Sequence, residues 1–209
     1  MPFTAKSKLQ GTFVSDCRTS TDLQLVEKWI YRDVPYAFRT KKEQYRDWRA
    51  ALADCFGLPV DAIVVVGSTA AGLSFNPDKR LRPHSPHSDI DVGVIAQNVF
   101  REAWDWFLRQ RVERIAYPAP VNGWIDDHKT RLIFFRQIGC DQYLEYLPFG
   151  RKWNACLDAA SKGSPVDGRP VKARIYEDSR SHQLSYAWRN QPTKKLEYLR
   201  SLSWVSKIS

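Results

Sequence analysis

The sequence has few of the features that would place it in a membrane or in a secretory class. No apolar run in the 209 residues approaches the roughly 18 residues that a bilayer-spanning helix requires. The amino-terminal stretch MPFTAKSKLQGTF has no apolar centre of the kind a signal peptide carries. No internal repeat or low-complexity linker marks a domain boundary. We therefore expect a single domain of cytoplasmic location that makes no contact with a membrane.

Cysteine is also scarce. The four cysteines, Cys17, Cys55, Cys140 and Cys156, form no CxxC motif and no Cys/His pairing at zinc spacing. We expect them to be reduced thiols of the core or the surface. The rest of the composition, 43% hydrophobic and 26% charged, is typical of a globular protein.

Acidic residues are outnumbered by basic ones. The 32 Lys and Arg residues exceed the 23 Asp and Glu residues, which gives a formal net charge of +9 and a pI of about 9.5. A basic balance favours polyanionic partners such as nucleotides or nucleic acid, and carries no sequence specificity. A solvated basic surface is the alternative explanation.

Local patterns predict a mixture of helices and strands. The sequence TKKE at residues 40–43 predicts a capping box between Thr40 and Glu43, and Gly57 ends the helix that follows. Trp48, Leu52, Cys55 and Phe56 would form the apolar stripe of that helix. Further helices are expected at residues 20–31, 98–111 (with Phe100, Trp104 and Leu108 inward) and 152–162. Residues 126–137 suit a helix or a strand equally.

Three segments have the character of strands. Residues 62–66 are a β-branched run of the kind that is buried on both faces, and residues 90–96 and 170–176 are the other two. Residues 1–19 are expected to be loosely held, and residues 178–204 to form two helices split at Pro192. Helices that alternate with a few strands predict an α/β or α+β fold.

Two of these strands border the residues that carry chemistry. The first ends in Gly67-Ser68, where glycine allows a tight turn and a close approach to a ligand, and serine can donate a hydrogen bond to phosphate. The second carries Asp89 and Asp91, which share one face because strand side chains repeat every two residues. Paired carboxylates repel unless a cation neutralises them, and hard oxygen ligands suit Mg²⁺. Taken alone, Gly67-Ser68 could be an ordinary turn, and Asp89 and Asp91 could be solvated carboxylates at a strand edge.

This order of motifs resembles the polymerase-beta-like nucleotidyltransferase superfamily, whose pattern is Gly-Ser, a short gap and Asp-x-Asp. The matching residues are Gly67, Ser68, Asp89 and Asp91, with Gly72 as the small residue further into the helix, and the resemblance is strongest over residues 62–96. It implies a small mixed sheet of the palm type flanked by helices. The expected organisation is a helical extension at residues 1–57, a catalytic core at 58–177 and a helical cap at 178–209.

The chain departs from the family pattern in two places. The gap between Ser68 and Asp89 is longer than usual, and its extra loop contains Lys79, Arg80, Arg82, His84 and His87. We expect Arg80 and Arg82 to contact the nucleotide, since arginine binds phosphate through two hydrogen bonds, and a solvated loop is the alternative. The family also places a third carboxylate on a later strand, as a base. Asp178 and Asp141 are the candidates here.

The resemblance implies a nucleotidyltransferase that depends on Mg²⁺ or Mn²⁺. It would move a nucleoside monophosphate from an NTP, with ATP the default substrate, to an acceptor and release pyrophosphate. The acceptor classes are a nucleic acid, an oligonucleotide, a protein or an antibiotic, and family members act in antiviral defence and toxin–antitoxin systems. The basic surface favours a macromolecular or nucleotide acceptor. Alternatives are an inactive module of the same fold that binds RNA or a partner protein, and a structural module in which Lys or Arg pairs with Asp89 and Asp91.

Overall fold

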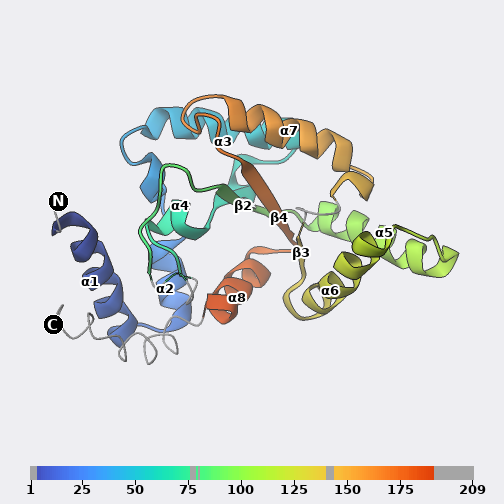
Figure 1. Ribbon diagram of the computed structural model, residues 1–209, viewed down its shortest axis with the longest axis horizontal. Coiled ribbons are helices and arrows are strands. Elements are labelled where there is room, and N and C mark those ends of the chain that lie inside the picture. The colour runs from blue at the N-terminus through green and yellow to red at the C-terminus, as the bar shows by residue number, and fades with distance from the viewer. Residues whose placement is uncertain (1–3, 76–78, 80, 140–143, 191–209) are drawn as a thin grey trace. The chain divides into compact units, whose positions relative to one another are not determined.

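The protein mixes helices with a small sheet, as the sequence predicts (Figure 1). The computed structural model describes residues 4–75, 79, 81–139 and 144–190. The helices are α1 (Thr4–Thr19), α2 (Asp22–Trp29), α3 (Lys42–Phe56), α4 (Gly67–Ala71), α5 (Gln97–Glu113), α6 (Ala119–Phe135), α7 (Gly150–Lys162) and α8 (Ser179–Asn190). The strands are β1 (Ile63–Val65), β2 (Ile90–Ile95), β3 (Gln137–Gly139) and β4 (Val171–Tyr176).

The chain divides into two compact units. The first contains residues 1–40, 65–88 and 183–209, and the second contains residues 41–64 and 89–182. Most of the sheet therefore belongs to the second unit, while Gly67 and Ser68 belong to the first.

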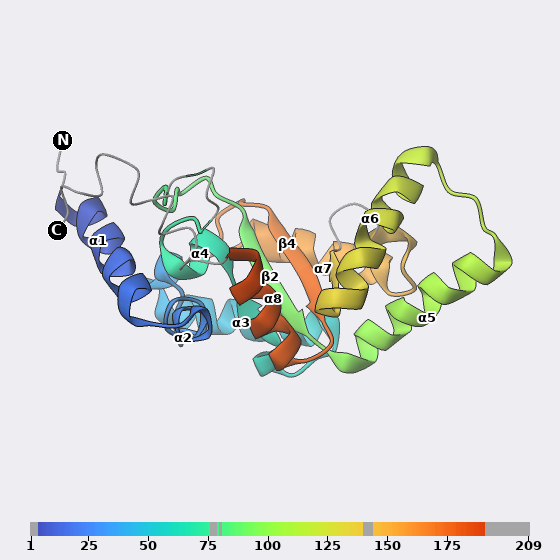
Figure 2. The same cartoon turned by 90° about the horizontal axis from the view of Figure 1, so that it is seen from below.

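Among the described residues, the sheet has four strands in the order β1-β2-β4-β3. Strand β2 pairs in parallel with β4, and β3 pairs antiparallel with β4. A parallel pair needs a crossover connection, and residues between β2 and β4 provide it with α5, α6 and α7. Helices α5 and α6 lie beyond β4 and to the same side of it (Figure 2).

One face of the sheet is apolar and forms the core of the second unit. Its residues alternate along both parallel strands and are nearly fully buried: Ile90, Val92, Val94, Val171, Ala173 and Ile175. Helices α3 and α7 lie side by side over the sheet (Figure 1). Phe56 of α3 stacks on Trp153 of α7, with ring centroids 4.1 Å apart. The predicted stripe of α3 is thus confirmed, since Trp48, Leu52 and Phe56 are buried.

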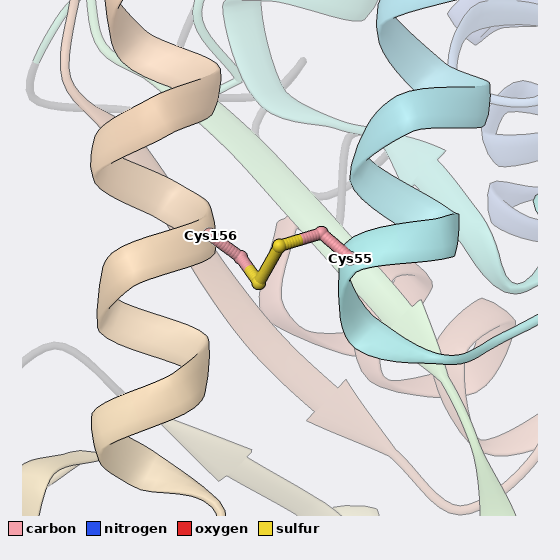
Figure 3. Close-up of a disulfide and its surroundings, with 2 residues drawn as sticks. All are labelled: Cys55 and Cys156. Atoms are coloured by element: carbon pink, nitrogen blue, oxygen red, sulfur yellow. A yellow bond between two sulfur atoms is a disulfide. The ribbon is translucent and has the colours of Figure 1, made fainter.

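A disulfide joins these two helices, which contradicts the prediction of reduced thiols. Cys55 of α3 bonds to Cys156 of α7 across a sequence separation of 101 residues (Figure 3). Spacing motifs detect only cysteines that are close in sequence, so they could not reveal this pair. Cys17 is a buried free thiol, and burial raises the pKa of Cys17 to about 12. Cys140 lies outside the described residues.

The amino-terminal segment is a helix and not the loosely held stretch that its polarity predicted. Phe13, Val14 and Cys17 of α1 are buried. The Phe13 ring packs edge-on to Trp29 of α2 at 5.1 Å and stacks on Phe75 at 4.8 Å. Long-range aromatic contacts of this kind cannot be read from local polarity.

Several local predictions need correction. The capping box lies at Thr21 and Gln24, at the start of α2, whereas α3 begins after Lys41 with no side-chain cap. Leu108 does not face inward, because it is 49% exposed. The ambiguous segment at 126–137 is helical up to Phe135. The predicted split at Pro192 lies outside the described residues. Among the helices of the described residues, none has both the length and the hydropathy that a bilayer crossing requires.

Candidate functional site

The two motif aspartates lie at the start of β2, a strand with a neighbour on each side. Asp89 immediately precedes the strand, and Asp91 is its second residue. Because β2 alternates, both aspartates share the face of Gly93, opposite the buried face of Ile90 and Val92. The Asp89 side chain is 40% exposed. A solute can therefore reach this carboxylate without disturbing the core.

The neighbouring strand β4 presents basic groups to the same face. In the parallel register, Asp91 is opposite Lys172 and Gly93 is opposite Arg174. Lys172 Nζ lies 2.6 Å from Asp89 Oδ2, and the Lys172 side chain is 45% exposed. This ion pair is what the structural alternative predicted for Asp89. Exposed ion pairs contribute only about 0–1 kcal/mol, so another cation can compete for the carboxylate.

Further along the same face, the imidazole ring of His182 packs against the sheet at Gly93. A Cβ added at Gly93 would lie 2.8 Å from His182 Nε2. The His182 ring meets Tyr176 of β4 edge-on, with centroids 4.5 Å apart, and the side chain is 0% exposed. Burial lowers the pKa of His182 to about 4, which keeps the ring neutral at pH 7. No sequence motif marks His182, and the close approach of its ring explains why Gly93 is a glycine.

Asp178, a candidate base, caps helix α8. Its Oδ1 accepts a hydrogen bond of 2.6 Å from the backbone N–H of Ser181. This hydrogen bond, together with nearby groups such as Arg136, holds the pKa of Asp178 below its ordinary value. Such an arrangement is sufficient to explain an aspartate at a helix start. Asp141, the other candidate, lies outside the described residues.

The predicted phosphate-binding residues belong to the first unit. Gly67 has φ of 66° and Gly72 has φ of 84°, a region that favours glycine. At Gly72 a Cβ would lie 2.6 Å from a carbon of the Tyr36 ring, so packing alone accounts for this glycine. Ser68 is the second residue of α4 and is half-buried.

The long loop carries one described arginine of the predicted pair. Arg82 is exposed, and its carbonyl accepts a hydrogen bond of 2.8 Å from the N–H of Ser74. An antiparallel bridge between Leu73 and Pro83 closes the loop. Arg80 lies outside the described residues. Nucleotide contacts by Arg80 and Arg82 remain a prediction.

The donor set at β2 suits a single divalent ion. Within residues 4–75, 79, 81–139 and 144–190, no group of three or more His, Cys, Asp or Glu side chains is placed to hold a metal ion. Two carboxylates on one accessible face fit one Mg²⁺ or Mn²⁺, because Mg²⁺ commonly takes one or two carboxylates and completes its shell with water and phosphate oxygens.

Comparison with protein-family models, with curated proteins and with solved structures finds no match to this chain.

Proposed function

We propose that the protein is a nucleotidyltransferase that moves a nucleoside monophosphate from an NTP to a macromolecular or nucleotide acceptor. The observation that supports this most is the placement of Asp89 and Asp91 on one accessible face of β2, in a chain where Gly67 and Ser68 begin the helix that follows β1. Strands β1 and β2 are neighbours in the sheet. The proposal includes a palm-type fold and a cytoplasmic location.

In this proposal Asp89 and Asp91 hold Mg²⁺ or Mn²⁺. The ion would neutralise charge on the phosphates during transfer. Gly67 and Ser68 would bind the β and γ phosphates, with help from Gly72 and the arginines of the long loop.

The test measures pyrophosphate release with each of the four NTPs in the presence of Mg²⁺ or Mn²⁺. Changing Asp89 and Asp91 together to Asn keeps the side-chain volume, removes the charge and should abolish release while the fold persists. The matched control is the pair Asp61→Asn and Asp167→Asn, which removes two exposed carboxylates of the same unit. Release that is undiminished by the Asp89/Asp91 variant would show the assignment to be wrong.

A second candidate is a non-catalytic module of the same fold that binds RNA or a partner protein. The ion pair between Lys172 and Asp89 favours it, because an ammonium occupies a carboxylate that catalysis would need for a metal ion. This candidate predicts no pyrophosphate release with any NTP. It also predicts that RNA or protein binding survives the Asp89/Asp91 change.

A further inference from the structure

The carboxylates of β2 have no acidic partner in either neighbouring strand. Strand β1 consists of Ile63, Val64 and Val65, and β4 has the sequence VKARIY. The β4 residues on the face of Asp91 are Lys172, Arg174 and Tyr176. At the positions from which a further carboxylate would have to come, β1 therefore offers only apolar side chains and β4 offers positive charge.

Lys172 stands out among the lysines of this unit because of its place in the sheet. It is opposite Asp91 in the strand register and ion-paired to Asp89 at 2.6 Å. Neighbouring strands lie about 4.8 Å apart, so the backbone sets the Lys172 side chain beside that of Asp91 on one face, while its ammonium contacts Asp89. The pair between Lys41 and Asp167, at 2.8 Å and with similar exposure, joins a loop to a loop and has no second carboxylate in strand register.

We propose that Lys172 is a built-in cation of the candidate site, and that its ammonium takes the place beside Asp89 that a second metal ion has in a two-metal site. The site then binds at most one divalent ion, through Asp91 and the accessible part of Asp89. This inference rests on the proposed function for its purpose, but it concerns the cation content of the site and not the transfer of a nucleotide. Lys172 would act as a positioning residue that sets where the single ion binds.

The electrostatics give the direction and size of the effect. Asp89 and Asp91 contribute two negative charges to this face, and Lys172 and Arg174 contribute two positive charges. Removing the Lys172 ammonium makes the face more negative by one unit charge and frees one Asp89 oxygen from competition. At a partly exposed site, loss of one unit charge a few ångströms from a divalent ion changes its affinity on the order of tenfold.

The experiment titrates Mn²⁺ into the full chain without nucleotide and reads free Mn²⁺ by electron paramagnetic resonance. For the wild type we expect at most one bound ion per chain, which is lost when Asp89 and Asp91 are changed to Asn. The Lys172→Gln variant should bind Mn²⁺ about tenfold more tightly than the wild type, because one positive charge has been removed from beside the ion. The matched control is Lys41→Gln, which breaks an ion pair of similar exposure and should leave binding unchanged. Circular dichroism checks that each variant is folded.

Two results would overturn the inference. One is two Mn²⁺ ions bound to the wild type and both lost in the Asp89/Asp91 variant. The other is a Lys172→Gln variant whose Mn²⁺ binding equals or falls below that of the wild type. Neither result depends on transfer activity, so failure here is distinguishable from failure of the proposed function. A chain that binds one ion as expected but releases no pyrophosphate refutes only the transfer proposal.

Discussion

The disulfide between α3 and α7 leads to a prediction about stability. Cys55 and Cys156 are 101 residues apart, so reduction releases a long loop in the unfolded chain. In the chain-entropy treatment, closing a loop of roughly 100 residues stabilises the folded state by about 4.7 kcal/mol, and removing native disulfides typically costs about 2–5 kcal/mol. We therefore expect reduction to lower the free energy of unfolding by about 2–5 kcal/mol, a large share of the roughly 5–15 kcal/mol of an ordinary domain.

The assay is urea unfolding followed by tryptophan fluorescence, with and without a reductant. The same change in free energy should lower the melting temperature by roughly 5–15 °C for a chain of this size. The double variant Cys55→Ala/Cys156→Ala should unfold like the reduced wild type and be insensitive to reductant. Cys17→Ala is the control, because its thiol is free and the variant should keep the full response to reductant.

Either of two observations would refute this reasoning. The first is a wild type whose unfolding free energy is equal with and without reductant. The second is alkylation of all four cysteines in the denatured, unreduced protein. The alkylation count also bears on location, since disulfides persist in oxidising compartments and are rare in cytosolic proteins. A disulfide that survives in protein taken directly from cells would argue against the proposed cytoplasmic location.

Three further predictions concern Gly93 of β2, His182 of α8 and the helix cap Asp178. Gly93→Ala should destabilise the protein by about 1–3 kcal/mol, because the added Cβ would lie 2.8 Å from His182 Nε2. The control is Gly123→Ala in α6, whose added Cβ meets nothing within 4 Å and should not destabilise the protein. Equal urea midpoints for the two variants would contradict this prediction. Burial lowers the pKa of His182 to about 4, so as the pH falls below about 6.5 the unfolded chain takes up the imidazole proton before the folded protein does. The free energy of unfolding should therefore decrease by about 3 kcal/mol between pH 6.5 and pH 4. This slope should be absent in His182→Gln and present in the exposed-site control His87→Gln. Asp178→Ala should cost about 0.5–2 kcal/mol as a lost helix cap, while Asp178→Asn keeps most of the stability. Loss of transfer in a stable Asp178→Asn variant would instead identify Asp178 as the base.

The sequence alone predicts the parts of the fold that depend on local alternation. The period of two residues in SDIDVGVI places Asp89 and Asp91 on one face, and the same period in VKARIY places Lys172 and Arg174 together. The structure confirms this alternation, because the intervening residues Ile90, Val92 and Ala173 are buried. Strong local periodicity survives folding because one face of a strand must meet the core.

The sequence could not predict what depends on which elements become neighbours. The ion pair between Lys172 and Asp89 requires the pairing of β2 with β4, which are separated by α5, α6, β3 and α7. The disulfide requires α3 and α7 to pack together. The burial of Phe13 in a polar segment requires Trp29 and Phe75 as partners. Each of these is a long-range contact with no local signature.

The same limit applies to the function. A Gly-Ser and Asp-x-Asp pattern can occur in an active transferase and in an inactive relative, because both need the same turn and the same strand. The neighbouring strand bears on this choice through the charge that it presents to the aspartates. Here that strand presents Lys172, so a carboxylate that abstracts a proton or holds a further ion must come from outside the sheet. If transfer is observed, the base is therefore to be sought on a loop or helix, or on the acceptor itself, and not among the strands.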